Sequence, residues 1–137
     1  MVQIQTNDGR WHVEDTWPPE DMTWNLADIG TDWMVTGDTV NGQGASVTLV
    51  SGELTELTHI SGLPTLHLEV TTQACQGGQI FATLYDNEDN LRLGHATMDV
   101  RYRDGGYDAK ATSPFSSYTM LMEFNPLDVV VPAGHTL

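Results

Sequence analysis

The chain has 137 residues, of which 19 are acidic and only 5 are lysine or arginine, so its formal net charge at pH 7 is -14. A surface of this sign repels phosphate backbones and anionic headgroups, and we therefore expect neither nucleic acid nor a membrane as a partner. The length suits one domain. Because the chain has neither a run of about 18 apolar residues nor a secretory signal, we expect a soluble protein, with the cytoplasm favoured.

The balance of charges leaves two environments open. An acidic, threonine-rich chain whose only lysine is Lys110 is typical of a protein from a high-salt cytoplasm, where hydrated carboxylates keep the surface soluble. An ordinary acidic domain fits the same composition. Cys75 is the only cysteine, so no internal disulfide can form and the core must hold the fold together.

The N-terminal stretch GRWHVEDTWPP concentrates apolar surface ahead of the main body of the chain. Trp11 and Trp17 are followed by Pro18 and Pro19. Tryptophan dominates interfaces as well as cores, and paired prolines stiffen a connection. We therefore predict that Trp11, Trp17 and Pro18 anchor this segment on a neighbouring domain. Stacking of exposed tryptophans on sugar rings is the alternative.

Residues 19–30, PEDMTWNLADIG, are the one helix candidate, because acidic residues follow Pro19 and Gly30 is suited to end a helix. Elsewhere, period-two alternation of apolar residues predicts β-strands. In chain order, the expected strands are 46–50, 65–71, 79–86, 96–103, 118–124 and 127–131.

Three of these strands carry a specific orientation. The alternation in 65–71 places its leucines and valine on one face and leaves His67 and Glu69 on the other. Residues 79–86 are apolar on both faces, which favours a central strand. In 96–103 the inward set is Met98, Val100 and Tyr102.

Turn chemistry separates the expected strands, because residues that tolerate positive φ recur between them. They occur at Asn41-Gly42, Gly77-Gly78, 86–90 and 103–106. The stretch 105–117 is expected to be a long loop. Many short strands with frequent turns predict an all-β fold of the sandwich or jelly-roll kind.

The usual signature of a serine hydrolase is missing. Such enzymes raise their nucleophile on a G-x-S-x-G turn between a strand and a helix. The nearest stretch here, GQGASVT at 42–48, lacks the second glycine and leads into an expected strand. No base is identifiable beside Cys75. We therefore expect no catalytic residue in this chain and no enzymatic activity of the chain on its own.

Carboxylates crowd the turn DNEDN, and oxygen-rich loops suit calcium. Asp86, Glu88 and Asp89 lie close in sequence, but Leu91 occupies the position of the EF-hand glycine and Thr97 that of its bidentate glutamate. A solvated hairpin tip is the favoured interpretation, with weak calcium binding as the alternative. The five histidines show no H-x-x-x-H spacing, so zinc is not predicted and no cofactor is expected.

Four stretches together resemble a known family: GRWHVEDTWPP, LTHISGLPTLHLEVT, QIFATLYDNEDNLRLGHATMDVRYRDGG and FNPLDVVVPAGHTL. In order and spacing they are similar to the C-terminal domain of the X-Pro dipeptidyl peptidase and cocaine esterase family of serine hydrolases. The matching positions are Trp11, Trp17 and Pro18; Ile60, Ser61, Gly62 and Pro64; Leu84 and Asp86; Gly94; and Pro132, Ala133, Gly134 and His135.

The resemblance implies a jelly-roll, galactose-binding-like β-sandwich without catalytic residues, since the family places its nucleophile, acid and base in a separate hydrolase domain. It implies a non-catalytic accessory domain that packs on a serine hydrolase catalytic domain, in the same polypeptide or as a separate chain. In the family such a domain helps to shape the substrate pocket and contributes to assembly. A stand-alone carbohydrate-binding module is the alternative, and an independent hydrolase is the third possibility.

The resemblance also sets the expected boundaries. Residues 1–20 are expected to be a linker that resembles the end of a hydrolase catalytic region, and 21–137 to be the β-sandwich domain. Family members continue beyond the last motif with further strands, so we expect the C-terminal strands to be truncated. An open edge left in this way recruits partners, and a homodimer is therefore expected.

Overall fold

The computed structural model describes residues 1–17, 48–72 and 77–137. The helix expected at 19–30, the turn at Asn41-Gly42, Pro18 and Cys75 lie outside these residues. In chain order the described elements are β1 (Val2–Gln5), β2 (Trp11–Glu14), β3 (Thr58–Gly62), β4 (Thr65–Thr72), β5 (Gln79–Asp86), β6 (Leu91–Asp99), the 3-10 helix η3 (Val100–Tyr102), β7 (Ser116–Glu123) and β8 (Leu127–Val131).

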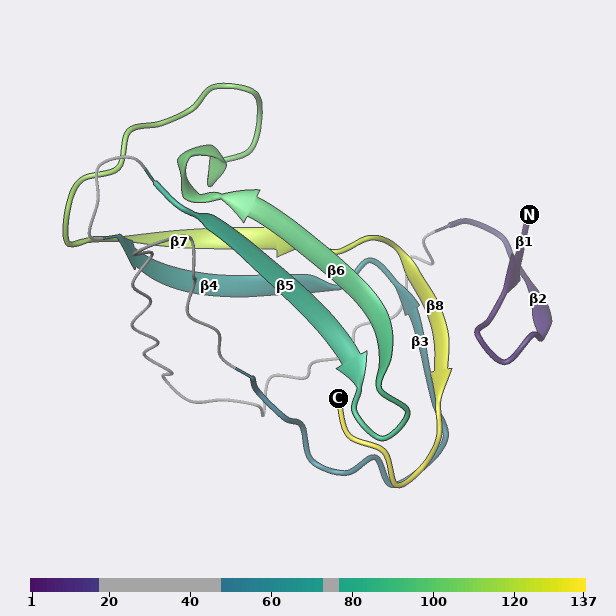
Figure 1. Cartoon of the computed structure of the whole chain (residues 1–137). Coiled ribbons are helices and arrows are strands. Elements are labelled where there is room, and N and C mark those ends of the chain that lie inside the picture. Colours follow the sequence, from purple (N-terminus) through teal and green to yellow (C-terminus); the bar gives the residue numbers. More distant parts are fainter. Residues whose placement is uncertain (18–47, 73–76) are drawn as a thin grey trace.

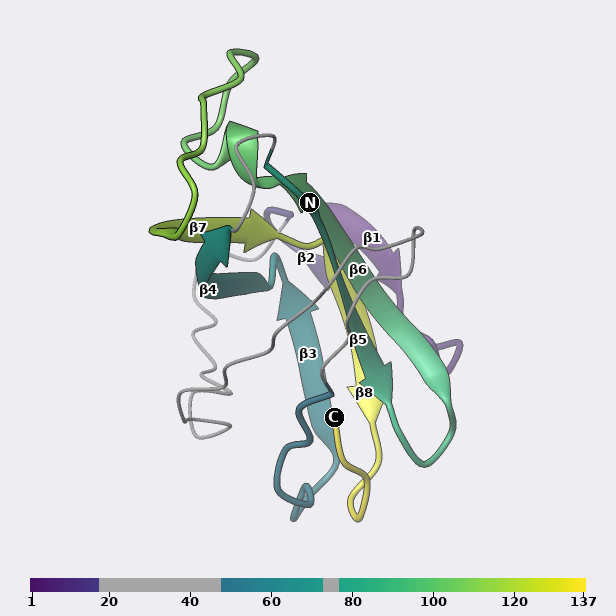
Figure 2. The same cartoon turned by 60° about the vertical axis from the view of Figure 1, so that its left-hand side comes forward.

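The larger layer is a bent antiparallel ribbon. β3 pairs with β8 and β4 pairs with β7, and only the short connections 63–64 and 124–126 separate these two pairs. Across the bend, the amide of Phe124 donates a hydrogen bond to the carbonyl of Pro64 (2.9 Å). The ribbon turns sharply there, so that β3 and β8 run across the direction of β4 and β7 (Figures 1 and 2).

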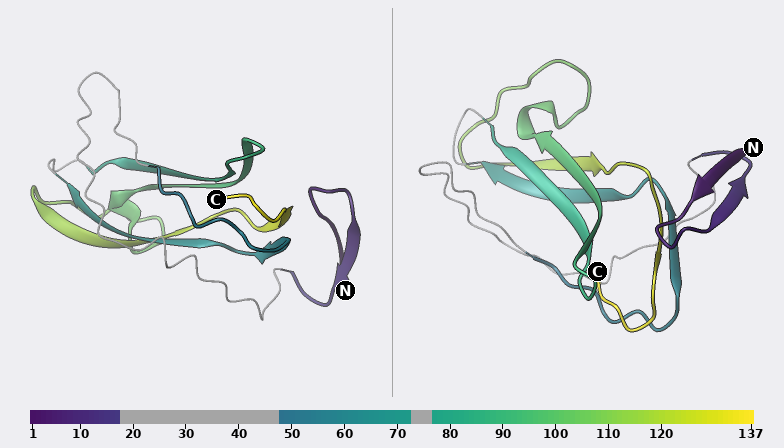
Figure 3. Two further views of the ribbon diagram at one scale, coloured as in Figure 1. Left: turned by 90° about the horizontal axis from the view of Figure 1, so that it is seen from below. Right: turned by 45° about the vertical axis from the view of Figure 1, so that its right-hand side comes forward.

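The β5–β6 hairpin forms the second layer. The two strands pair antiparallel around the turn 87–90, where Asn90 has a φ of 51°. This turn is the one expected at 86–90. The hairpin lies over the bent ribbon, and the left-hand view of Figure 3 shows the two layers edge-on.

A β-bulge and a glycine let β6 approach the ribbon. Tyr85 pairs with Arg92 while the residue before it pairs with Gly94, so Leu93 is an extra residue, and its side chain joins the core. Gly94 lies so close to Leu127 that a Cβ atom would sit 2.9 Å from the leucine Cδ2. A residue with a Cβ atom at this position would therefore require the Leu127 side chain to move.

Asn125, at the bend of the ribbon, ties the layers together. Its amide donates a hydrogen bond to the His95 carbonyl (3.2 Å), and its side-chain oxygen accepts one from the His95 amide (2.9 Å). The asparagine thereby satisfies both backbone polar groups of a β6 residue, as a neighbouring strand would.

The hydrophobic core lies between the layers. Leu93, Val131 and Leu137 are buried together, with partly buried Leu54, Ile60, Leu84 and Val129 packed against them. Along β7, buried Met120 and Met122 alternate with exposed Leu121 and Glu123. This alternation gives the ribbon one core face and one outer face.

The predicted all-β sandwich is confirmed, and the jelly-roll strand order stays a prediction. The strand expected at 127–131 is β8, and the strand expected at 65–71 lies within β4, with His67 and Glu69 exposed. The strand expected at 118–124 corresponds to β7. In the part of the chain that the structure describes, no helix combines the length and apolar character needed to cross a membrane.

The prediction of a strand at 96–103 is wrong for residues 100–103. β6 ends at Asp99, and η3 follows. The Asp99 carboxylate accepts hydrogen bonds from the Arg101 amide (2.9 Å) and guanidinium (2.6 Å), which caps the helical turn. Val100 is buried as expected, but it reaches the core from a helical turn.

Two further expectations about strands are wrong. Residues 79–86 form β5, but β5 pairs with β6 alone, so among the described strands it is not a central one. Its second apolar face is exposed, since Phe81 is 74% exposed and Tyr85 is also exposed. Of the strand expected at 46–50, the described residues 48–50 have no regular secondary structure.

The first residues form a β-hairpin that the sequence did not predict. β1 pairs with β2 antiparallel, and a hydrogen bond from the Gly9 amide to the Thr6 carbonyl (2.9 Å) closes the turn. At its tip, the Asn7 side chain donates a hydrogen bond to the Val130 carbonyl (2.9 Å) and accepts one from the Val130 amide (2.6 Å). These two bonds anchor the hairpin on β8, and Figure 1 shows the hairpin at the same side of the fold as β8.

The layered packing predicts different costs for two neighbouring truncations. Met120→Ala should lower the free energy of unfolding by about 2–5 kcal/mol, because it leaves a cavity under a nearly inaccessible side chain. Leu121→Ala, on the outer face of the same strand, is the matched control and should change it by about 0.5 kcal/mol or less. Urea unfolding measures both values, and equal losses would contradict the assignment of the two faces.

Candidate functional site

Two histidines and a carboxylate from three different strands meet where the N-terminal hairpin contacts the β3–β8 pair. His59 on β3 is hydrogen-bonded through Nε2 to Oδ1 of Asp128 on β8 (2.8 Å). His12 on β2 places its Nε2 3.3 Å from Asp128 Oδ2 and 3.6 Å from Glu14 Oε1. The two imidazole rings meet edge to face, with centroids 5.3 Å apart. We call His12, His59 and Asp128 the His–Asp cluster.

Three buried polar atoms at or beside this cluster make no hydrogen bond. His12 Nε2, Asp128 Oδ2 and Ser61 Oγ are buried and have no hydrogen-bond partner. The Asp128 side chain is only 5% exposed, and Ser61 is its cross-strand partner in the β3–β8 register. Because buried polar atoms are nearly always hydrogen-bonded, three unpaired atoms around one pair of strands are unusual.

The His–Asp cluster is not a Ser-His-Asp triad. Such a triad requires a serine hydroxyl that is hydrogen-bonded to the imidazole base. The Ser61 hydroxyl makes no hydrogen bond, and the Nε2 atoms of both histidines lie against the Asp128 carboxylate. The cluster therefore contains no activated serine, and its chemistry is that of nitrogen and oxygen donors converging on one point.

A second charged cluster holds the C-terminal residues. Both carboxylate oxygens of buried Asp86 lie 2.9 Å from His135 Nδ1. Glu88 accepts hydrogen bonds from the Thr136 amide (2.6 Å) and hydroxyl (3.0 Å). Leu137 follows and is buried in the core. We call Asp86, Glu88 and residues 135–137 the tail clasp.

The tail clasp shifts two pKa values in favour of the charged forms. The hydrogen bond to Asp86 raises the pKa of His135, and the charges of Asp86, Asp89 and Glu88 act in the same direction. The hydrogen bond from the Thr136 amide lowers the pKa of Glu88. The folded state therefore stabilises protonated His135 relative to neutral His135, and ionised Glu88 relative to protonated Glu88.

The tail clasp also bears on the calcium alternative at Asp86, Glu88 and Asp89. The oxygens of Asp86 are engaged by His135, and those of Glu88 by Thr136. Asp89 is exposed. Because two of the three carboxylates already accept hydrogen bonds from the tail, the geometry favours a structural role over calcium binding.

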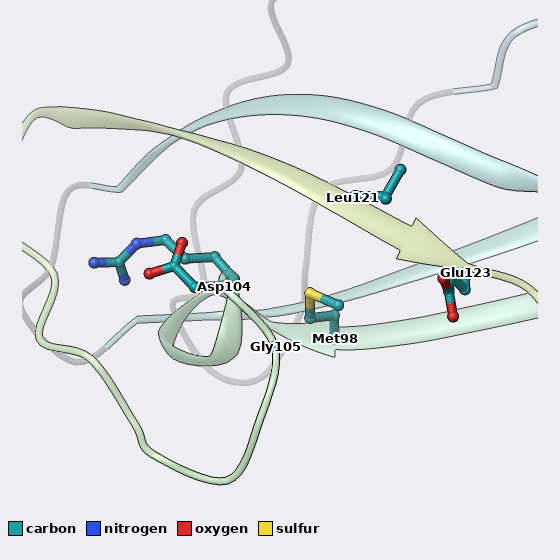
Figure 4. Close-up of a pocket in the computed structure, with 6 residues that line it drawn as sticks. Met98, Asp104, Gly105, Leu121 and Glu123 are labelled. Atoms are coloured by element: carbon teal, nitrogen blue, oxygen red, sulfur yellow. The ribbon is translucent and has the colours of Figure 1, made fainter.

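A shallow cavity of about 350 Å³ lies between β6, β7 and the loop after η3 (Figure 4). Its lining residues are Met98, Arg103, Asp104, Gly105, Leu121 and Glu123. Arg103 donates hydrogen bonds to two backbone carbonyls and lies 4.2 Å above the Tyr118 ring, and Asp104 is paired with Lys110. Arg103 and Asp104 therefore interact with neighbouring protein groups, and neither points to a ligand role for this cavity.

The residues predicted to form a domain interface fall in and beside the N-terminal hairpin. Trp11 is 66% exposed, Trp17 is partly buried, and Pro18 lies outside the described residues. Trp11 and Val13 point to the outer face of the hairpin, while His12 and Glu14 point to the face that meets the His–Asp cluster. The hairpin thus has a docked inner face and an uncovered outer face.

Sequence reasoning missed the His–Asp cluster. His59 and Asp128 are 69 residues apart, and spacing rules detect ligands only when they lie on one local element. The one available signal was alternation, which puts His12 with Glu14 and His59 with Ser61 on common strand faces. Only the pairing of β3 with β8 and the docking of the hairpin bring these faces together.

The tail clasp predicts a pH window of stability. The pKa of His135 is raised above its ordinary 6.5, so its contribution is complete below that pH and is lost as the pH rises through the raised pKa. The pKa of Glu88 is lowered from its ordinary 4.5, so its contribution is complete above that pH and is lost as the pH falls through the lowered pKa. Both contributions are present between these two ordinary values.

Urea unfolding of the wild-type chain and His135→Gln, at about pH 6 and about pH 9, tests this window. We expect the difference in unfolding free energy between them to shrink at the higher pH, because the contribution of protonated His135 is lost as the pH rises through its raised pKa. His67→Gln, at an exposed histidine on β4, is the control and should show no such pH-dependent difference. A wild-type advantage over His135→Gln that grows toward pH 9 would contradict the assignment.

Comparison with known proteins identifies the family. The model of the X-Pro dipeptidyl-peptidase C-terminal non-catalytic domain matches residues 1–137, and no curated protein and no solved structure matches the chain. The family resemblance drawn from the sequence is thereby confirmed. Two of the motifs that carried it, at Asp86 and His135, are the partners of the buried ion pair. The chain belongs to this family of non-catalytic domains.

Proposed function

We propose that this chain, as a member of the X-Pro dipeptidyl-peptidase C-terminal non-catalytic domain family, is the accessory domain of a serine hydrolase that acts on X-Pro peptides or esters. The catalytic domain is expected in the same polypeptide or as a separate chain. The accessory domain packs on it, shapes one side of its substrate pocket and contributes to assembly.

The observation that carries this proposal is the uncovered outer face of the β1–β2 hairpin. Trp11 is 66% exposed there, and Val13 beside it is exposed as well. Exposed tryptophan is rare on surfaces that have no partner and is enriched at the centres of interfaces. A catalytic domain that covers this face would bury both side chains.

The anchoring of the hairpin suits it to this task. Asn7 makes two hydrogen bonds with Val130, and His12 lies against Asp128. A face that is held in place before it binds loses less conformational entropy on docking than a loose segment does. On this proposal the linker expected at 1–20 is a preformed docking element, with Trp17 and Pro18 continuing the join.

Replacement of Trp11 by alanine tests the docking face. Binding of the isolated chain to a family catalytic domain, measured by calorimetry, should weaken by about 2 kcal/mol or more if Trp11 is an anchor of the interface. The stability of the chain itself should change by about 0.5 kcal/mol or less, because the side chain is exposed. Tyr107→Ala, at a fully exposed aromatic in the loop after η3, is the matched control. Unchanged binding by Trp11→Ala would remove this face from the proposal.

The assembly part of the proposal concerns β5. Its edge away from β6 pairs with no other described strand, and Phe81 on its outer face is 74% exposed. Open edges with exposed apolar residues promote pairing between chains, so we propose a homodimer that buries Phe81.

Light scattering across micromolar concentrations tests this dimer. The wild-type chain should have twice the mass of the monomer, and Phe81→Lys should return it to the monomer mass, because a charge on this face opposes burial. Tyr107→Lys should leave the mass unchanged. A wild-type monomer throughout this range would reject the dimer.

A further inference from the structure

We propose that the His–Asp cluster, together with Glu14, is a binding site for a divalent transition-metal ion, with Zn²⁺ as the expected ion. The bound ion would fasten the N-terminal hairpin to the β3–β8 pair. The inference rests on the cluster itself and does not depend on the docking role of the hairpin.

The donor atoms of the cluster are spaced like ligands of one ion. One atom from each of His12, His59 and Asp128 lies within 4.8 Å of the others. Ligands bound tetrahedrally to zinc at about 2.0–2.1 Å lie roughly 3.3–3.4 Å from one another. His12 Nε2 lies 3.3 Å from Asp128 Oδ2 and 3.6 Å from Glu14 Oε1. The separation between His12 Nε2 and Asp128 Oδ2 is that of two ligands around one ion. His59 Nε2 lies 2.8 Å from Asp128 Oδ1, so binding of an ion would exchange this hydrogen bond for a longer separation between two ligands.

Two of the donor atoms are buried and make no hydrogen bond. His12 Nε2 and Asp128 Oδ2 are buried without a hydrogen-bond partner although they face each other. The Asp128 side chain is 5% exposed, so its carboxylate has little access to water. A cation between these two atoms would satisfy both at once, because a neutral imidazole nitrogen and a carboxylate oxygen are both metal ligands. The buried Ser61 hydroxyl, opposite Asp128 in the register, is a further oxygen beside the site.

The donor set selects the class of ion. Two imidazoles with one or two carboxylates suit Zn²⁺ and its neighbours in the first transition row, whereas Ca²⁺ and Mg²⁺ prefer sites made of oxygen alone. With neutral histidines, Asp128 and Glu14 supply two negative charges, which a divalent ion balances. His12, His59 and Asp128 supply three ligands that already lie close together. Glu14, whose Oε1 lies 3.6 Å from His12 Nε2 but outside this group, would have to move toward the ion to complete the tetrahedral set of a structural site.

The other group of potential ligands differs in this respect. Asp86, Asp89 and His135 also lie within 4.8 Å of one another. There, however, both Asp86 oxygens are already engaged by His135 Nδ1. In that group the buried carboxylate is hydrogen-bonded, whereas His12 Nε2 and Asp128 Oδ2 of the His–Asp cluster are buried and make no hydrogen bond. We therefore expect substitutions in the His–Asp cluster to weaken Zn²⁺ binding and a substitution in the second group to leave it unchanged.

Zn²⁺ titration of the full chain tests the proposal. In a Cys75→Ser background, which removes the thiol as a competing ligand, we expect calorimetry to show one equivalent of Zn²⁺ bound. The thermal midpoint should be higher with Zn²⁺ than with EDTA, since a ligand that binds only the folded state stabilises it. Co²⁺ in place of Zn²⁺ should give the intense visible absorption of a tetrahedral site with nitrogen and oxygen ligands.

Single substitutions locate the ion. His12→Gln, His59→Gln and Asp128→Asn should each weaken Zn²⁺ binding by at least about tenfold and abolish the cobalt spectrum. His67→Gln controls for an exposed histidine outside the cluster, and Asp89→Asn controls for the second group, and both should bind as the parent does. Circular dichroism in EDTA checks that each variant is folded, and three separate ligand variants guard against the loss of one to misfolding.

Three results would overturn the proposal. The first is the absence of stoichiometric Zn²⁺ binding by the folded parent chain. The second is full binding by His12→Gln and His59→Gln, which would place the ion elsewhere. The third is loss of binding in Asp89→Asn with retention in the cluster variants, which would assign the ion to the second group.

Discussion

The buried carboxylate of Asp86 is the interaction on which the closure of this sandwich depends. A charge so far from water is costly unless it is paired, and the imidazole of His135 pairs with both of its oxygens. The pair holds the end of the chain against the turn of the β5–β6 hairpin, and this brings Leu137 into the core beside Leu93 and Val131. The polar contact thus determines where the apolar side chains meet.

The second constraint is the close approach of the two layers at the bend of the ribbon. Gly94 touches Leu127, and Asn125 supplies hydrogen bonds to the backbone of His95. These contacts set the position of β8 relative to β6. They also set the position of the N-terminal hairpin, because its tip is bonded to β8 through Asn7. The position of the hairpin that carries Trp11 therefore depends on packing at the centre of the fold, and the alternation along β2 turns Trp11 outward.

The two faces of the N-terminal hairpin differ in their contacts. Its inner face carries His12 to a buried carboxylate, and its outer face carries Trp11, which is 66% exposed. A firm inner contact and an open outer one are what a docking element requires, since the anchored side fixes the geometry and the open side supplies the apolar area. If an ion holds the inner face, it also holds the outer one in place.

Period-two alternation and a handful of motifs were enough to predict the all-β class, the strands β4, β7 and β8, and the family, because these depend on local pattern and residue order. Alternation failed at residues 100–102, where the Asp99 carboxylate caps a helical turn, and it overstated the burial of β5, whose outer aromatics are exposed. Alternation could not predict the His–Asp cluster. His12, His59 and Asp128 become neighbours only through the pairing of β3 with β8 and the docking of the hairpin, and contacts between distant segments leave no trace in local spacing.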